Sequence, residues 1–278
     1  HKQIAKKLKN RNATNKRRKF MHFAWGILFA SLNHFLPRST FLPIMSTLTA
    51  ITLFMELMRY REGFQWINTS MHYLFGKSLR KSEMDGKFTG SLYYFAGVTA
   101  TSYLYPQSCA TLGIIQLAIA DPTASYFGRA TRHVYWSRIN KGFAGGLGRN
   151  KGILGFLGGG LACVPINYRI LSLACNTVVR SSSIGASGAG ASTALAISNP
   201  TILIASLVLG LAGAFADLIV PTPALTLPKT ICGKTVPPFH LDDNFIVPVL
   251  SGYACTQIFK YVLGVPSMIV PLSKYLIV

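Results

Sequence analysis

The chain has 278 residues, of which half are hydrophobic and only 13% are charged. Soluble domains usually carry about 25% charged residues, so this composition excludes an ordinary soluble domain and favours a polytopic membrane protein. The charge is also unbalanced: 28 residues are Lys or Arg and eight are Asp or Glu, which gives a net charge of +20.

A nucleic-acid-binding protein is the first alternative that this charge suggests. Such proteins place their basic residues among solvated polar residues. Here the basic residues gather between apolar runs, as the positive-inside rule expects of loops on the cytosolic side of a membrane. We therefore predict an anionic lipid surface, and no nucleic acid, as their partner.

The first third of the chain predicts two membrane helices after a basic tail. The tail, residues 1–19, carries nine Lys or Arg and no acid, and we expect it in the cytosol. Apolar runs at about 20–36 and 40–58 are separated by Pro37 and predict the first two spans. A polar loop, 59–89, follows, and its HYLFGKSL stretch is typical of a short interfacial helix.

The middle of the chain predicts two short spans and one glycine-rich span. The short runs lie at about 90–105 and 108–120, and we expect them either to tilt little or to be shielded by neighbouring helices. A second polar loop, 121–151, holds six basic residues. The glycine-rich apolar segment 152–178 follows, with a predicted break near Asn167.

The last third predicts one span that returns the chain to the cytosolic side and another that crosses the membrane again. A low-complexity Ser/Gly loop at about 180–200 is expected on the far side. A span at about 201–220 leads to a Pro-rich cytosolic loop, 221–244, before a span at about 245–265 and a short final run. We predict an all-α fold with about seven to eight transmembrane helices, in which residues 20–278 form a single domain.

This topology brings the acidic residues to one side of the membrane. The basic tail and the two basic loops are separated by two spans each, so all three face the same side, and their Lys and Arg make it the cytosolic side. Carboxylates in or beside membrane spans are costly and are therefore candidates for function. Those near the cytosolic face are Glu56, Asp121, Asp217, Asp242 and Asp243. We predict that they share one site.

The run DPTASYFGR, from Asp121 to Arg129, is the most specific candidate for chemistry. It places an acid at the expected end of a helix, followed by the small residues Ala124 and Gly128. Small residues let a phosphate chain or its metal ion approach the backbone closely. The run therefore favours a phosphate-binding site.

A glycine-rich stretch about twenty residues later contains Lys141 and Gly145. A lysine among small residues can reach a phosphate as a point charge, while exposed backbone N–H groups bind anions. An ordinary basic loop beside a membrane span is the alternative interpretation.

Asp242, Asp243 and Asn244 precede the last strong span. Carboxylate and amide oxygens suit Mg²⁺ with a bound phosphate. The same residue types are favoured as helix N-caps, and both interpretations can hold together.

Two further acids need a partner. Glu56 and Arg59 lie three residues apart on one helical face, which favours an ordinary ion pair within the helix. Asp217 lies inside an apolar span, so it requires Lys141, Lys151 or a metal ion nearby.

These runs resemble the CTP-dependent lipid kinases, which include dolichol kinase, phytol kinase and the fungal-type CTP-dependent diacylglycerol kinase. The nucleotide motif of that family begins D-x-x-A-x-x-x-G, which is similar to the pattern of Asp121, Ala124 and Gly128. It ends about twenty residues later in a Lys-small-x-x-Gly stretch, which is similar to Lys141 and Gly145.

Further runs, in the right order, resemble the diacylglycerol kinase branch and extend the resemblance over most of residues 17–255. They are Arg18–His22 against R-K-x-x-H, Glu56–Arg59 against D/E-x-x-R, Gly90–Tyr94 against G-x-L-x-Y, and Asp242–Ser251 against D-D-N-F-x-x-P-V-L-S.

The chain also departs from the family pattern. Arg132 stands where a second motif glycine is expected, Gly142 replaces a small hydroxyl residue, and Asp217 stands where a Glu is usual. The Pro-rich segment 221–241 resembles an insertion. A near-repeat of the lysine motif makes Lys151 a second candidate for the phosphate lysine, although spacing favours Lys141.

The resemblance implies an enzyme that transfers the γ-phosphate of CTP to a lipid hydroxyl, best fitted by diacylglycerol, with phosphatidic acid and CDP as products. Such phosphoryl transfer depends on positioning and charge neutralisation. The expected residues are Asp121, Asp242, Asp243 and Asn244 for Mg²⁺ or another divalent cation, Ala124, Gly128, Arg129, Lys141, Gly145 and Lys151 for CTP, and Asp121, Lys141, Asp217 and Glu56 for catalysis. Asp217 and Glu56 remain alternatives for the group that orients or deprotonates the hydroxyl.

The resemblance also implies the endoplasmic reticulum, or the nuclear envelope, with the site facing the cytosol. A dolichol, polyprenol or phytol kinase is the nearest alternative. A CTP-using cytidylyltransferase would release pyrophosphate instead, and a transporter would use the intramembrane acids to bind coupling ions.

Overall fold

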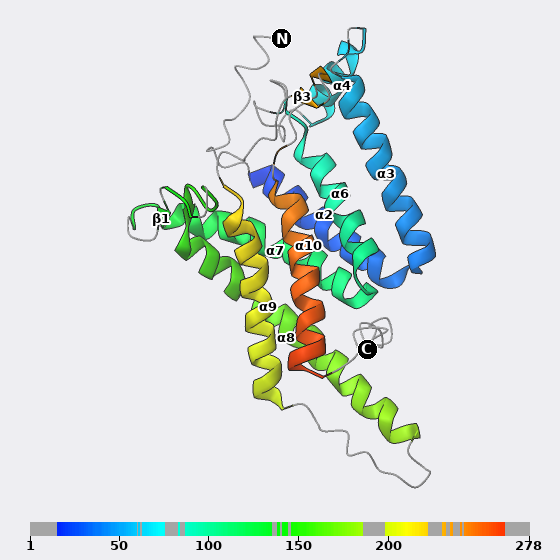
Figure 1. The fold of residues 1–278 in the computed structure, drawn as a ribbon, viewed down its shortest axis with the longest axis vertical. Helices are drawn as coiled ribbons and strands as arrows, with labels where there is room; N and C mark the ends of the chain where they lie inside the picture. The colour runs from blue at the N-terminus through cyan, green and yellow to red at the C-terminus, as the bar shows by residue number, and fades with distance from the viewer. Residues whose placement is uncertain are drawn as a thin grey trace.

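The structure of the chain, a computed structural model, is mostly helical (Figure 1). It describes residues 16–59, 61, 63–75, 83, 87–134, 138–139, 141–143, 146–185, 198–221, 230–231, 234–235, 240 and 242–264. Four predicted features lie outside the described residues: nearly all of the basic tail, residues 186–197 of the Ser/Gly loop, most of the Pro-rich loop, and the final run 265–278.

Eight helices and two short ribbons make up the described part of the chain. The helices are α2 (Lys16–Phe35), α3 (Arg38–Met58), α4 (Gln65–Phe75), α6 (Gly90–Leu104), α7 (Gln107–Ala130), α8 (Ile153–Gly185), α9 (Asn199–Ile219) and α10 (Asp243–Gln257), which continues into a π-helical turn, Ile258–Val262. The antiparallel ribbons pair β1 (Arg138–Ile139) with β2 (Lys151–Gly152) and β3 (Thr230–Ile231) with β4 (Lys234–Thr235). The helical class is confirmed, and the ribbons are additions that the sequence did not predict.

Four of the described helical segments are long and apolar enough to cross a membrane. They are α3, residues Ile153–Leu173 of α8, α9, and the segment Asp243–Val262. The predicted seven to eight spans are therefore not confirmed. Helix α2 begins with a basic run and α6 has only 15 residues, so neither offers a long apolar stretch.

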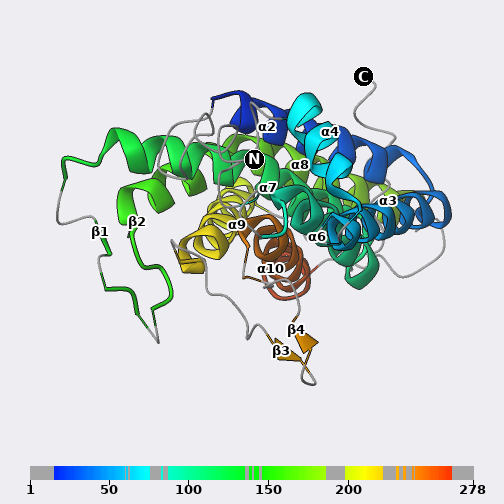
Figure 2. The same ribbon diagram turned by 90° about the horizontal axis from the view of Figure 1, so that it is seen from above.

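Helix α7 is the central helix of the bundle. It contacts α2, α6, α8, α9 and α10, and every residue from 108 to 118 is buried. Figure 2 shows it surrounded by these helices when the bundle is seen from above. The expectation that neighbours shield this segment is confirmed. A helix that meets other helices on all sides needs no continuous apolar face toward lipid.

Helix α7 is longer than the sequence predicted. It continues beyond Asp121 to Ala130, although Pro122 lies inside it. The hydroxyl of Thr123 donates hydrogen bonds to the carbonyls of Ile119 and Ala120, which helps to satisfy backbone oxygens around the proline. Asp121 is therefore inside a helix and not at a helix end.

Helix α8 does not break near Asn167, and this prediction was wrong. The Asn167 side chain accepts a hydrogen bond from Gln116 of α7 at 2.6 Å and donates one to the carbonyl of Ser206 in α9 at 3.1 Å. An asparagine that is satisfied by neighbouring helices has no need to interrupt its own helix.

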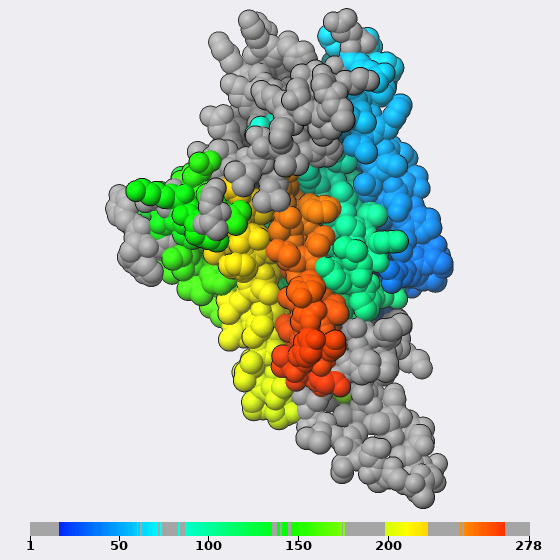
Figure 3. All heavy atoms as spheres, viewed as in Figure 1, coloured from blue at the N-terminus to red at the C-terminus, as the bar shows by residue number. Residues whose placement is uncertain are grey.

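Small residues bring the helices close together. A Cβ atom on Gly113 of α7 would lie 2.7 Å from the carbonyl oxygen of Pro248 in α10, and one on Gly210 of α9 would collide with the carbonyl of Gly160 in α8. Such contacts are typical of helix interfaces in membranes. Figure 3 shows α9, α10, α6 and α3 side by side on one face.

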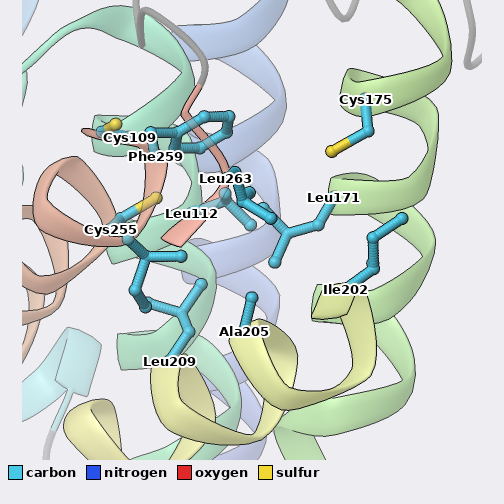
Figure 4. Close-up of a cluster of buried hydrophobic side chains, with 11 residues drawn as sticks. Cys109, Leu112, Leu171, Cys175, Ile202, Ala205, Leu209, Cys255, Phe259 and Leu263 are labelled. Carbon is cyan, nitrogen blue, oxygen red and sulfur yellow. The ribbon is translucent and has the colours of Figure 1, made fainter. Parts of the chain in front are cut away.

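One of two large apolar clusters is drawn from the starts of α7 and α9 and the end of α10 (Figure 4). It contains Cys109 and Leu112 near the start of α7, Ile202 near the start of α9, and Cys255 and Phe259 at the end of α10. Asp121, Asp217 and Asp243 lie toward the opposite ends of the same helices. The end of the bundle that holds these carboxylates is called its polar end, and α10 runs antiparallel to α7 and α9.

Candidate active site

Three carboxylates from three helices meet at the polar end of the bundle. Asp121 comes from the middle of α7, Asp217 from the last turn of α9, and Asp243 from the first position of α10. One oxygen from each lies within 4.8 Å of the other two, and the residues are 5%, 6% and 8% exposed. Like charges this close and this buried require compensating cations.

Two lysines supply part of that compensation. The ammonium of Lys19, from α2, donates to both carboxylate oxygens of Asp121 at 2.8 and 2.9 Å. The ammonium of Lys151 donates to Asp217 at 2.8 Å. His22 Nε2 lies 3.5 Å from Asp121.

The carboxylates also keep Lys151 charged. Burial alone would lower the pKa of its ammonium. The charge of Asp217 first, and those of Asp243 and Asp121 after it, raise the pKa above the ordinary value for lysine. Lys151 therefore remains a fixed positive charge over the cluster.

The β1–β2 ribbon holds Lys151 in this position. Ile139 pairs with Lys151 across the ribbon, and the N–H of Gly148 donates to the carbonyl of Ile219 at the end of α9 at 3.0 Å. Gly148 has a φ of 69°, and a Cβ there would stand 2.6 Å from the Phe143 ring. A glycine is needed at this turn, so the loop is fixed against the end of the helix that carries Asp217.

The small residues of the DPTASYFGR run have a structural role. A Cβ on Gly155 of α8 would lie 2.8 Å from the carbonyl oxygen of Ala124 and 3.0 Å from Gly128 Cα. A Cβ on Gly159 would lie 2.8 Å from the Ala124 side chain. Ala124 and Gly128 therefore let α7 and α8 pack closely, and both also line the cleft above the carboxylates.

That cleft has a volume of about 150 Å³ and is rich in positive charge. The carboxylates lie in its wall, and five basic residues line it: Lys19, Arg129, Arg132, Arg138 and Lys151. Five cations against three carboxylates leave a net positive charge. The arrangement can bind a highly charged anion beside a cation site.

Two predicted site residues lie elsewhere. Glu56 is buried at the end of α3, where it pairs with Arg59 at 2.9 Å and accepts hydrogen bonds from the N–H and the hydroxyl of Thr89. It joins α3 to the start of α6 and does not line the cleft. Lys141 is exposed and also lies outside the cleft lining. Gly145 is outside the described residues.

The three residues Asp242, Asp243 and Asn244 have different roles in the structure. Asp242 is the N-cap of α10, accepting from the N–H of Asn244 at 3.0 Å, and its second oxygen lies 3.2 Å from Nε2 of His240. Asn244 donates to the carbonyl of Gly90 at 3.2 Å. Among the described residues, only Asp243 of this run joins the carboxylate cluster.

Lys19 and His22 were not predicted as site residues. They lie three residues apart on one face of α2, and both approach Asp121. The sequence pattern that could have indicated them is a basic residue and a histidine at this spacing at the start of an apolar helix. Only their contact with α7 shows what they do.

The donor set fits a small divalent cation. Carboxylate oxygens are hard ligands, and bonds of about 2.0–2.1 Å to Mg²⁺ place opposite ligands about 4.2 Å apart. Neighbouring ligands of such an ion lie about 2.9 Å apart, so the oxygens of Asp121, Asp217 and Asp243, within 4.8 Å of one another, would need to close by up to about 2 Å.

Comparisons of the chain with protein-family models, with curated proteins and with solved structures give no match.

Proposed function

We propose that the protein is a CTP-dependent lipid kinase, which transfers the γ-phosphate of CTP to the hydroxyl of diacylglycerol and forms phosphatidic acid and CDP. The observation that carries this proposal is the buried cluster of Asp121, Asp217 and Asp243 in a cleft with excess positive charge. Enzymes of phosphoryl transfer act mainly by positioning and by neutralising charge. The choice of CTP and diacylglycerol rests on the resemblance of the sequence runs.

The position of the site along the helices supports a lipid acceptor. Asp217 lies two residues before the end of α9, and Asp243 begins α10. Both α9 and the segment Asp243–Val262, which is α10 with its π-helical turn, are of membrane-spanning length and apolarity. The cluster therefore lies level with the ends of two candidate spans. A lipid hydroxyl is found at this depth, where hydrocarbon meets the headgroups. The cytosolic side of the endoplasmic reticulum is the location that we propose.

We assign the cleft residues to roles by their positions. Asp121 and Asp243 would hold Mg²⁺, which when bound neutralises phosphate charge. Lys151 contacts the transferred phosphate, and Arg129 contacts the phosphate chain at the rim. Lys19 holds both oxygens of Asp121 and so fixes the direction of that carboxylate.

Asp217 is the residue that we assign to the proton. The lipid hydroxyl oxygen forms a bond to the γ-phosphorus while the bond from that phosphorus to the β–γ bridging oxygen breaks, and CDP leaves with the electron pair. The hydroxyl proton passes to Asp217. Glu56, the alternative, is held by Arg59 and Thr89 away from the cleft.

The test is phosphate transfer from γ-labelled CTP or ATP to diacylglycerol, dolichol and phytol in Mg²⁺-containing micelles. We expect labelled phosphatidic acid from CTP alone, loss of this product in Asp121→Asn, and full activity in Arg61→Ala, which changes an exposed residue outside the cleft. Labelled dolichol or phytol would reassign the acceptor. Release of pyrophosphate would indicate a cytidylyltransferase, and no turnover by folded protein would refute the proposal.

A further inference from the structure

Three arginines line the cleft without a carboxylate partner among the described residues. Arg129 lies in the last turn of α7, Arg132 follows the end of that helix, and Arg138 belongs to β1. In the part of the chain that the structure describes, none of the three forms an ion pair. Lys19 and Lys151, in contrast, each hold a carboxylate.

The guanidinium of Arg129 is placed unfavourably without an anion. Burial and the neighbouring charge of Arg132 lower the pKa of Arg129, and Asp121 offsets this only in part. Guanidinium groups bind phosphate oxygens in a two-pronged geometry, which a lysine cannot match. A cluster of such groups at the edge of a cleft is therefore suited to a chain of phosphates.

The cleft has two zones along α7. Asp121 and Arg129 are eight residues apart on this helix, which corresponds to about 12 Å along its axis. The carboxylates lie at the ends of the candidate spans α9 and α10, whereas the arginines lie at the far end of α7 and on the ribbon that follows it. The first zone therefore lies level with the ends of the candidate spans, and the second lies beside the loop that follows α7.

We propose that Arg129, Arg132 and Arg138 form a polyphosphate subsite, which holds the α- and β-phosphates of a nucleoside triphosphate while the γ-phosphate lies over the carboxylates. This inference rests on the proposed function for the identity of the γ-phosphate acceptor, but the anion site itself does not. Arg132 stands where the family pattern expects a glycine, so the subsite is a property of this chain. The nucleotide enters from the loop side, and the lipid reaches the opposite zone from the membrane.

Inorganic tripolyphosphate is the probe for the subsite, because it lacks a base and a sugar. Its binding is measured by titration calorimetry with the full chain in phosphatidylcholine nanodiscs, without a divalent cation. We expect Arg132→Ala and Arg138→Ala each to weaken binding about 10- to 100-fold, as for the loss of hydrogen bonds to a charged group. Arg61→Ala is the matched control, and Arg132→Lys should recover only part of the loss.

The phosphate of a lipid headgroup could bind the same arginines. A second experiment distinguishes a headgroup from a free polyphosphate. The nanodiscs are prepared again with phosphatidic acid. If the arginine variants lose affinity for these membranes and bind tripolyphosphate like the parent, the subsite is a headgroup site and the proposal is overturned. Unchanged tripolyphosphate binding in both alanine variants overturns it as well.

Measuring the KM for CTP distinguishes a failure of this inference from a failure of the proposed function. If CTP supports lipid phosphorylation, the KM for CTP should rise about tenfold or more in Arg132→Ala and remain unchanged in Arg61→Ala. Transfer with an unchanged KM refutes the subsite and leaves the function intact. Arginine-dependent tripolyphosphate binding without any transfer refutes the function and leaves the subsite intact. Thermal unfolding of each variant shows that the fold is retained.

Discussion

Replacing Lys151 tests whether distance or sequence spacing identifies the phosphate lysine. The side chains of Lys151 and Asp217 are 17% and 9% exposed, and their charged atoms lie 2.8 Å apart. Breaking a fully buried ion pair costs about 3–5 kcal/mol. Because water reaches part of Lys151 and screens the pair, we expect Lys151→Ala to lower the free energy of unfolding by about 1–3 kcal/mol.

The effect on the reaction should be larger than the effect on folding. Removing a charged group aimed at the transferred phosphate typically lowers kcat by about 10²- to 10³-fold. Lys141 is exposed and outside the cleft, so Lys141→Ala should change kcat/KM by no more than about twofold, as is usual for surface substitutions.

A double-mutant cycle separates the two roles of Lys151. Lys151→Ala, Asp217→Asn and the double variant are compared by denaturant unfolding in detergent and by initial rates with CTP. The double variant should regain most of the lost stability, because no unpaired buried charge remains, but it should not regain activity. A large loss of activity in Lys141→Ala, with normal kinetics in Lys151→Ala, would refute the assignment by distance.

Three further substitutions test other parts of the structure. Glu56→Gln should lower the free energy of unfolding by about 1–3 kcal/mol, because Arg59 loses its charged partner, while the KM for CTP stays unchanged in the folded fraction; a changed KM would place Glu56 in the site. Asp121→Asn and Asp243→Asn should each weaken Mn²⁺ binding by at least about tenfold, measured by electron paramagnetic resonance, and normal binding in either would remove that residue from the cation site. Gly159→Leu should destabilise the protein by about 1–3 kcal/mol by forcing α7 and α8 apart, and an unchanged melting temperature would contradict the close packing.

Sequence patterns could predict that acids gather, but not which acids. Carboxylates beside apolar runs, with basic loops on one side, place residues at a common depth in the membrane. The structure brings Asp121, Asp217 and Asp243 together, and it leaves Glu56 with Arg59 and Thr89. Topology gives the depth of a residue and says nothing about its position around the bundle, which depends on the order in which the helices pack.

The sequence alone could not predict that Lys151, and not Lys141, lies beside the carboxylates, because this depends on the β1–β2 ribbon. Spacing from Asp121 favours Lys141, because the motif that the sequence resembles places its lysine about twenty residues after the aspartate. In the structure, the pairing of Ile139 with Lys151 and the hydrogen bond from Gly148 to the end of α9 turn the loop back on itself. Two-residue strands of this kind leave almost no trace in the sequence.

Helix α7 shows how a buried helix can carry polar groups inside an apolar bundle. It packs against three of the four segments of membrane-spanning length and is buried along most of its length. This burial lets α7 carry two polar side chains. Gln116 donates a hydrogen bond to Asn167 of α8, and Asp121 accepts one from Lys19 of α2. A carboxylate cluster inside a membrane bundle needs a helix whose polar groups are satisfied by other helices. The packing of α7 against its neighbouring helices is therefore the property that suits it to carry the candidate site.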